Sequence, residues 1–262
     1  MVFGRNWKDI IVNCLIIEGV EVISWTLYQG DCIEQLQKLP DQSVQTAVTS
    51  PPYWGLRDYG VKGQLGLEPT PELYVQNMVE VFHEVKRVLR DDGTVWLNLG
   101  DSYAGNCSRA SNGGRAGFGN PRETITNRMP EGLKNKDLVG IPWSVAFALR
   151  ADGWWLRQDI IWHKPNPMPE SVTDRCTKAH EYIFLLSKSG RYFYDADAIK
   201  EESTWNGQSG DKNYRGYDGR EGETMNTLSQ FNGKRNKRSV WTVATQPYKE
   251  AHFATFPPKL IE

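Results

Sequence analysis

The segment Thr49-Ser50-Pro51-Pro52-Tyr53-Trp54, within AVTSPPYWGLRDYG at residues 47–60, carries the strongest structural signal in the sequence. It follows the run from Val44 to Thr49, which predicts a buried β-strand. The two prolines lack amide hydrogens and have a fixed φ, so sheet pairing stops there and the chain must turn. We therefore expect a hydroxyl group, two prolines and an aromatic ring just beyond the end of a strand.

Predicted strands and helices alternate on both sides of this segment. Asp31 with Glu34 is typical of a helix start, as is Thr70-Pro71-Glu72. The second of these helices is expected to end at Asp92-Gly93. Alternation of this kind favours a parallel α/β sheet. The other predicted elements are strands at 24–29, 94–99 and 154–162 and a helix at 142–151.

A hairpin is predicted near the end of this pattern. Residues 181–187 and 192–194 flank Lys188-Ser189-Gly190, a typical turn sequence. We therefore expect an antiparallel hairpin at one edge of the sheet.

Composition sets limits on the number of domains and on the partners. A chain of 262 residues, 39% of them hydrophobic, is long enough for one α/β catalytic domain over residues 1–262 with insertions. The net charge of -1 means that any nucleic-acid contact must come from local clusters of charge. Two polar segments, at about 104–137 and 201–239, are either solvated linkers or functional insertions. The sequence Lys234-Arg235-Asn236-Lys237-Arg238 in the second favours contacts with phosphates.

Cysteine spacing and hydropathy exclude several other classes. The four cysteines form no CxxC pair, which favours reduced thiols in a cytoplasmic protein. Cys176 and His180 lack a second pair of ligands, so no metal site is predicted. The apolar run DIIVNCLII at residues 9–17 is too short for a membrane span and lacks a signal-peptide cleavage site. Oligomeric state is left open.

The end of the strand at Thr49 also suggests a chemistry. Ligands of open α/β sheets bind beyond the carboxyl ends of strands, so Ser50, the carbonyls of Pro51 and Pro52 and the Tyr53 ring are expected to face a ligand. A planar ligand with an exocyclic amine fits, because the amine can donate to Ser50 and Pro51 while Tyr53 stacks on its ring. The alternative is a simple strand-terminating turn.

Six segments in order along residues 24–262 resemble the permuted (β-group) amino-methyltransferases of DNA from restriction-modification systems and prophages. The resemblance implies a Rossmann-like methyltransferase sheet and S-adenosylmethionine as methyl donor. It implies double-stranded DNA as the substrate, with the target base flipped out, and a bacterial or phage-encoded enzyme. The segments are QGDCIEQL, TSPPYWGLRDYG, LNLGDSYAG, IIWHKPNP, AHEYIFLLSKSGRYFYD and HFATFPPKLIE.

The resemblance also assigns roles to single residues. Ser50, Pro51, Pro52 and Tyr53 form the expected catalytic motif, and serine before Pro-Pro-Tyr favours cytosine N4 over adenine N6. Trp54 is either a packing residue or a DNA contact. The expected cofactor-binding residues are Asp31, Phe253, Thr255 and Phe256, and the expected phosphate contacts are Lys234, Arg235, Lys237 and Arg238.

The sequence departs from the family pattern after HFATFPPKLIE. Family members continue into a strand and an F-x-G-x-G loop that holds the cofactor, and this sequence has no F-x-G-x-G. That strand would lie between the strands ending at Gln29 and Thr49, so these two are not expected in one continuous sheet. We therefore expect the C-terminal cofactor-binding portion to be absent and this chain by itself to have little activity. The alternatives are a non-catalytic DNA-binding remnant, a subunit of a split methyltransferase, or an amine methyltransferase of RNA or protein.

Overall fold

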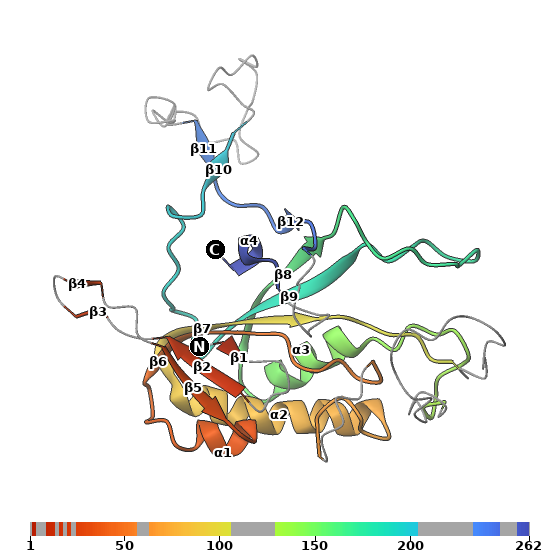
Figure 1. Cartoon of the computed structure of the whole chain (residues 1–262), viewed down its shortest axis with the longest axis horizontal. Helices are drawn as coiled ribbons and strands as arrows, with labels where there is room; N and C mark the ends of the chain where they lie inside the picture. The colour runs from red at the N-terminus through yellow and green to blue at the C-terminus, as the bar shows by residue number, and fades with distance from the viewer. Residues whose placement is uncertain are drawn as a thin grey trace, which may run out of the picture. The chain divides into compact units, whose positions relative to one another are not determined.

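The computed structural model (Figure 1) describes residues 25–56, 63–105, 129–203, 233–246 and 256–261, with the backbone of four short strands within residues 2–21. The chain divides into two compact units. The first comprises Met1–Phe193 and Val240–Glu262, and the second comprises Tyr194–Ser239. The polar segment predicted at 201–239 lies within the second unit.

A mixed sheet forms the centre of the first unit, with strand order β12-β8-β9-β7-β6-β1-β2-β5. β6 is parallel to β7, and β9 runs antiparallel between β7 and β8. The carboxyl ends of β6, β7 and β8 therefore meet at one edge of the sheet, together with the amino end of β9. The strands are β1 (Val2–Phe3), β2 (Asp9–Asn13), β5 (Trp25–Gln29), β6 (Val44–Thr49), β7 (Leu89–Leu99), β8 (Trp155–His163), β9 (His180–Ser187) and β12 (Val240–Thr242).

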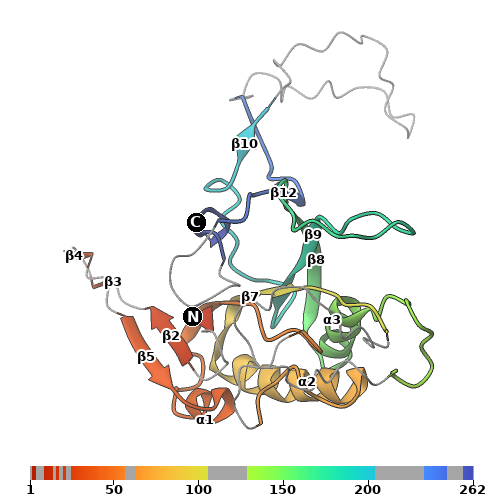
Figure 2. The same ribbon diagram turned by 45° about the vertical axis from the view of Figure 1, so that its right-hand side comes forward.

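Helices α1 (Cys32–Leu36), α2 (Pro71–Val88) and α3 (Ile141–Ala151) lie along one face of this sheet, as Figure 2 shows from a second angle. Successive side chains of a strand point to opposite faces. Phe184 of β9 accordingly joins the main core under the helices, whereas Ile183 joins a smaller cluster on the other face. The side chains packed in that smaller cluster come from the sheet and from the segment around α4 (Pro258–Ile261): Ile160, Trp162, Trp96, Trp241, Val243, Phe256 and Leu260.

The predicted helix starts are confirmed. Asp31 Oδ1 accepts hydrogen bonds from the backbone N–H groups of Ile33 and Glu34 at 3.0 and 3.2 Å. Thr70 Oγ1 accepts from the N–H of Leu73 at 3.2 Å. Both side chains thus satisfy N–H groups that have no partner within the first turn of their helices.

The predicted end of the second helix is wrong. α2 ends at Val88, and Asp92-Gly93 lies inside β7. Leu89 is fully buried and pairs with Val44 of β6, so sheet pairing takes over directly after the helix. Gly93 fits here because a Cβ atom would lie 2.8 Å from the carbonyl oxygen of Gln45.

The predicted antiparallel strand at residues 181–187 is confirmed as β9, but it does not pair with residues 192–194 in a hairpin at the edge. β9 pairs with both β7 and β8, and residues 192–194 form no strand. Ile183 to Leu186 is apolar at every position and buried on both faces, which is typical of an interior strand. The edge is formed by β12, which pairs in parallel with β8.

The strands ending at Gln29 and Thr49 lie in one continuous sheet, contrary to expectation. β1 pairs in parallel with β6, through Val2 and Val48. β2 pairs antiparallel with β1 and with all five residues of β5, from Asp9↔Gln29 to Asn13↔Trp25. β1 and β2 thus fill the position between the two strands.

The remaining short strands form two-stranded ribbons. β3 (Ile16–Ile17) pairs with β4 (Val20–Glu21) in the first unit. β10 (Glu201–Glu202) pairs with β11 (Lys234–Arg235) in the second unit. In the parts of the chain that the structure describes, no helix is long and apolar enough to cross a bilayer.

Candidate active site

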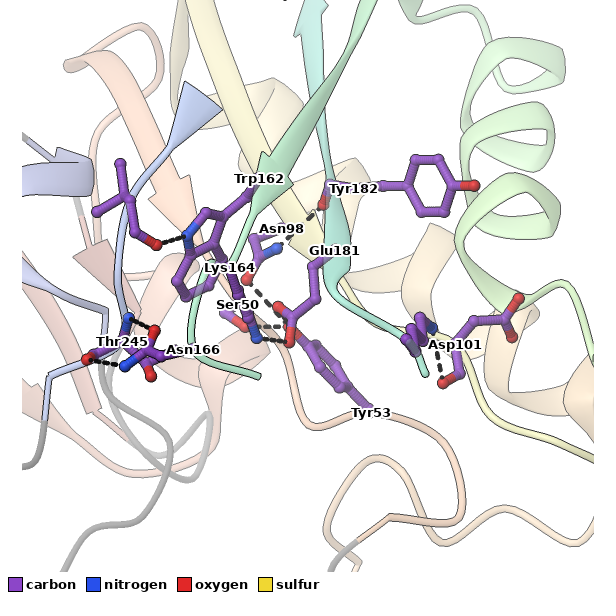
Figure 3. Close-up of polar contacts among 12 residues, drawn as sticks. Ser50, Tyr53, Asn98, Asp101, Trp162, Lys164, Asn166, Glu181, Tyr182 and Thr245 are labelled. Carbon is purple, nitrogen blue, oxygen red and sulfur yellow. Dashed lines mark hydrogen bonds and ion pairs between the residues drawn. The ribbon is translucent and has the colours of Figure 1, made fainter. Parts of the chain in front are cut away.

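Four strands bring polar side chains to the carboxyl edge of the sheet (Figure 3). Ser50 follows β6 and Lys164 follows β8. Asn98 lies near the end of β7. Glu181 lies near the start of β9, opposite Trp162 of β8. These residues are distant in sequence and meet because β9 runs antiparallel to its two neighbours.

The hydroxyl group of Tyr53 is the centre of this cluster. Its oxygen lies 2.7 Å from Glu181 Oε2, 3.0 Å from Asn98 Oδ1 and 3.2 Å from Ser50 Oγ. Burial raises the pKa of the Tyr53 phenol well above its usual value, and the neighbouring Glu181 carboxylate raises it further. Tyr53 therefore remains protonated and donates a hydrogen bond.

Glu181 is held from both sides of its carboxylate. One oxygen accepts from Tyr53, and the other forms an ion pair with Lys164 Nζ. The Lys164 ammonium also lies 4.2 Å from the centroid of the Trp162 ring, within cation–π range. Only 17% of the Glu181 side chain and 19% of that of Lys164 are exposed, so each charge has a partner away from bulk water.

Asn98 and Gly100 fix the position of the Tyr53 ring. The side-chain NH2 of Asn98 donates to the carbonyl oxygen of Tyr182 at 3.0 Å, so its Oδ1 is the atom that faces Tyr53. A Cβ atom at Gly100 would lie 2.5 Å from Cε2 of Tyr53. Glycine at this position lets the ring lie against the end of β7.

The prolines after β6 differ in what their carbonyl groups contact. The Pro52 carbonyl, expected to face a ligand, instead accepts a hydrogen bond from the hydroxyl of Tyr74 in α2 at 3.0 Å. Tyr74 is fully buried, and this burial raises the pKa of its phenol. The Pro51 carbonyl has no hydrogen-bond partner among the described residues. Ser50 Oγ donates to Tyr53, so its lone pairs and the Pro51 carbonyl oxygen are the acceptor groups of this motif that have no donor among the described residues.

Trp54 anchors the following turn. Its Nε1–H donates to the carbonyl oxygen of Glu68 at 3.0 Å. The Glu68 carboxylate accepts from the N–H of Gly66 and from Asn77 of α2 at 2.8 and 3.0 Å. Trp54 is packed against the main core, which favours the packing alternative over a DNA contact.

Asp101 follows β7, and both its carboxylate and its carbonyl oxygen accept hydrogen bonds from other parts of the fold. Its carboxylate accepts hydrogen bonds from the N–H groups of Gly140 and Ile141 at the start of α3. Its carbonyl oxygen accepts from Lys178 Nζ at 3.0 Å. Burial lowers the pKa of the Lys178 ammonium. These contacts tie the end of β7 and the start of α3 to the segment that leads into β9.

The segment after β12 is tied to the segment after β8 (Figure 3). The side chain of Asn166 donates to the carbonyl oxygen of Thr245 and accepts from its N–H, at 3.1 and 3.0 Å. The Trp162 indole donates to the Val243 carbonyl oxygen at 2.8 Å. Residues 240–245 are thereby fixed beside the same edge as Lys164.

The predicted cofactor residues lie in two places. Asp31 caps α1 with Oδ1 alone, just after β5. Phe256 packs on the sheet face that carries Ile183 and Trp162. Phe253 and Thr255 lie outside the described residues. Among the described residues, no three His, Cys, Asp or Glu side chains are grouped so as to hold a metal ion.

The predicted phosphate-contacting residues all lie in the second unit. Nε of Arg235 lies 2.9 Å from Oε1 of Glu201, and Nε of Arg238 pairs with the same oxygen. Lys234 pairs with Glu202 across the two-stranded ribbon, and Lys237 follows β11. Part of the positive charge is therefore balanced within this unit.

Sequence reasoning missed three residues of the cluster: Asn98, Lys164 and Glu181. Each is polar and lies at one terminus of an apolar strand, in LNLGD, IIWHK and HEYIF, with Glu181 at the start of its strand. The signal was therefore present, but it becomes informative only when β7 and β8 are known to end where β9 begins.

Comparison with known proteins gives a consistent picture. Residues 44–262 match the model of the DNA methylase family N6_N4_Mtase. The type II methyltransferase M.Cfr9I of Citrobacter freundii is 47% identical over 247 residues, which are 93% of this chain and 72% of that protein. M.SmaI of Serratia marcescens is 46% identical over 234 residues, 87% of this chain and 70% of that protein.

A solved structure of a DNA methyltransferase shares the fold. The cytosine-N4-specific PvuII DNA methyltransferase superposes with a TM-score of 0.54 at 16% identity, covering 89% of this chain and 66% of that chain. The chain thus spans slightly less than two thirds of that solved structure. The superposition confirms the predicted Rossmann-like α/β class.

Proposed function

The chain belongs to the DNA methylase family, and from this membership we propose that it transfers a methyl group from S-adenosylmethionine to an exocyclic amine in double-stranded DNA. Cytosine N4 is favoured over adenine N6 as the target, and the cytoplasm of a bacterium is the proposed location. The observation that carries the proposal is the pair of acceptors, Ser50 Oγ and the Pro51 carbonyl, directly beyond the end of β6.

The acceptor pair addresses the chemical difficulty of the reaction. An aromatic amine is a poor nucleophile because its lone pair is delocalised into the ring. Two acceptors that bind its hydrogens favour a more tetrahedral nitrogen, whose lone pair is then directed at the methyl group. The reaction needs no covalent enzyme intermediate. Burial and the neighbouring Asp31 raise the pKa of the Cys32 thiol to about 12, so this residue is no thiolate nucleophile.

The target base must leave the duplex to reach Ser50. Enzymes that act on a base flip it out and replace the lost stacking with protein contacts. The Tyr53 ring is held by its hydroxyl group and by the close approach to Gly100, so we propose it as the preformed stacking surface. We propose Lys234, Arg235, Lys237 and Arg238 as phosphate contacts.

Groups at the carboxyl edge fit the adenosine part of the cofactor. Asp31 is exposed and uses only Oδ1 to cap α1, which leaves Oδ2 for a hydroxyl or amine donor. Thr49 Oγ1, at the end of β6, is buried and lacks a partner within the described residues. When bound, S-adenosylmethionine would supply the electrophilic methyl group. β1 and β2 fill the position between β5 and β6, so the strands that precede Asp31 and Ser50 belong to one sheet within this chain.

Expression in a bacterial host without DNA methylation tests the proposal. Mass spectrometry of the nucleosides from host DNA is expected to show N4-methylcytosine, and none when Ser50→Ala is expressed instead. N6-methyladenine would contradict the choice of cytosine. Unmodified DNA in a host that contains folded, soluble wild-type protein would contradict the proposed methyl transfer.

A further inference from the structure

The Tyr53 hydroxyl has one hydrogen and three oxygen neighbours. Two of these neighbours can only accept. Glu181 presents a carboxylate oxygen to Tyr53 and forms an ion pair with Lys164 through the other oxygen, and Asn98 presents Oδ1 because its NH2 group donates to the Tyr182 carbonyl. A carboxylate at 2.7 Å is the stronger and closer acceptor, so the Tyr53 hydrogen is directed to Glu181.

This arrangement determines the direction of the hydrogen bond between Ser50 and Tyr53. The Tyr53 hydroxyl has no second hydrogen. Ser50 must therefore be the donor in the hydrogen bond between the two hydroxyl oxygens, which lie 3.2 Å apart. The lone pairs of Ser50 Oγ are then left facing away from Tyr53. Ser50 is thereby fixed as a hydrogen-bond acceptor, although a serine hydroxyl can usually rotate to donate or accept.

We propose that Lys164, Glu181 and Tyr53 form a positioning chain that holds Ser50 as an acceptor, so that the site takes bases with an exocyclic amine and rejects bases with a carbonyl at that position. This inference rests on the proposed function and adds the residues that select the substrate group. Lys164 and Glu181 act through Tyr53 and do not contact the base.

The preference for an amine over a carbonyl arises because a carbonyl would leave both acceptors, Ser50 Oγ and the Pro51 oxygen, without a donor. An amine donates one hydrogen to Ser50 Oγ and one to the Pro51 carbonyl. A carbonyl oxygen at the same place meets lone pairs on both groups, and neither acceptor gains a partner. Sites with buried polar groups reject ligands that leave those groups unpaired far more strongly than apolar sites reject a change of shape. Cytosine and uracil differ at this ring position by an amine in place of a carbonyl, as do adenine and hypoxanthine.

Glu181→Gln is the variant that tests the chain of contacts. Its amide has the same shape as the carboxylate but can donate to Tyr53, which frees the hydrogens of both Tyr53 and Ser50 to turn. Glu84→Gln is the matched control, because Glu84 is also ion-paired, with Arg87, and its side chain is 21% exposed against 17% for Glu181. Tyr53→Phe is a second test variant that removes the link between Glu181 and Ser50.

The first measurement uses duplexes containing the mapped target site, with either cytosine or uracil at the target base, or adenine and hypoxanthine if adenine is modified. Single-turnover transfer and duplex affinity are measured for each protein at saturating S-adenosylmethionine. For each protein, the affinity for the duplex with the amine is divided by the affinity for the duplex with the carbonyl. This ratio is then compared between proteins, because the two duplexes also differ in how easily the base leaves the stack.

The wild-type protein and Glu84→Gln are expected to give the same ratio and the same rate. Glu181→Gln and Tyr53→Phe are expected to lower the preference for the amine at least about tenfold, and kcat about 100-fold with KM changed less than about threefold. Wild-type values in both test variants would overturn the inference and leave the proposed function standing.

A neutron crystal structure of the deuterated protein provides the second measurement and does not depend on activity. The Ser50 deuterium is expected on the line from Oγ to the Tyr53 oxygen. A deuterium directed elsewhere would overturn the positioning chain even if the enzyme is active. If the wild-type protein modifies no DNA, the proposed function fails, while the neutron map still decides the orientation of Ser50.

Discussion

The hydroxyl of Tyr53 lies 2.7 Å from Oε2 of Glu181, although 128 positions separate the two residues in the sequence. Tyr53 follows β6, and Glu181 lies in β9, which is separated from β6 by β7. The contact exists because parallel β6 and β7 end where antiparallel β9 begins. It links the segment proposed to hold the target base to a charged pair on the far side of β7.

Replacing Ser50 with alanine is expected to lower the rate of methyl transfer about 100-fold, because the amine loses one of its two acceptors. Binding of S-adenosylmethionine is expected to change less than about twofold. Single-turnover rates and calorimetry on the same preparation check this. A variant that loses cofactor affinity and keeps its rate would place Ser50 on the wrong side of the site.

Gly100→Ala tests the close approach of the Tyr53 ring to β7. The added Cβ would lie 2.5 Å from Cε2 of Tyr53, so the ring must shift, and we expect a loss of about 1–3 kcal/mol in the free energy of unfolding and a slower transfer rate. Gly105→Ala is the control, because its Cβ would meet only Asn135 Oδ1, at 3.5 Å. Urea denaturation measures both variants, and equal stability would show that the ring adjusts freely.

The charged residues of the second unit are expected to affect DNA binding in opposite directions. Neutralising Lys234, Arg235, Lys237 and Arg238 together is expected to weaken binding to all sequences and to reduce the salt slope by about 0.9 for each lost phosphate contact. Glu201→Gln is expected to strengthen binding, because it releases Arg235 and Arg238 from their shared carboxylate. Titrations at several salt concentrations test both, and an unchanged slope would contradict the phosphate contacts.

Lys164→Met is expected to destabilise the protein by about 1–3 kcal/mol, because it leaves the carboxylate of Glu181 without its cation in a mostly buried position. Combining it with Glu181→Gln is expected to recover part of this loss, because the uncompensated charge is then removed. A double-mutant cycle of unfolding free energies measures the coupling. Purely additive losses would contradict a structural ion pair.

The buried phenols of Tyr53 and Tyr74 predict a loss of stability at high pH. Both have a raised pKa in the folded protein, so their contribution is present below the usual tyrosine pKa of about 10 and is lost as pH rises above it. The unfolding free energy is expected to fall by about 1.4 kcal/mol per pH unit for each phenol. Tyr53→Phe should remove one of these contributions in urea titrations at about pH 9 and about pH 11, and an unchanged slope would contradict the burial of its hydroxyl.

Local signals in the sequence were sufficient for much of the fold and for part of the site. The two prolines mark the end of β6, and the side chains of Asp31 and Thr70 mark the starts of α1 and α2. Ser50 to Tyr53 lie where the sequence predicts, at the carboxyl edge. These features depend on neighbouring residues alone, so a single sequence reveals them.

Features that depend on strand order could not be obtained in this way. The interior position of β9 depends on pairing with two strands at once, and its apolar run also fits one strand of a hairpin. The position of β1 and β2 between β6 and β5 depends on contacts made across the sheet. The roles of Asn98, Lys164 and Glu181 follow only once these neighbours are known.

The most direct test of the account is a methyl-transfer reaction with purified protein, duplex DNA and S-adenosylmethionine that carries a deuterated methyl group. Mass spectrometry of the digested DNA is expected to find N4-methylcytosine with the deuterated methyl group for the wild-type protein, and none for Ser50→Ala. DNA without the label, from wild-type protein that binds both cofactor and DNA, would contradict the account.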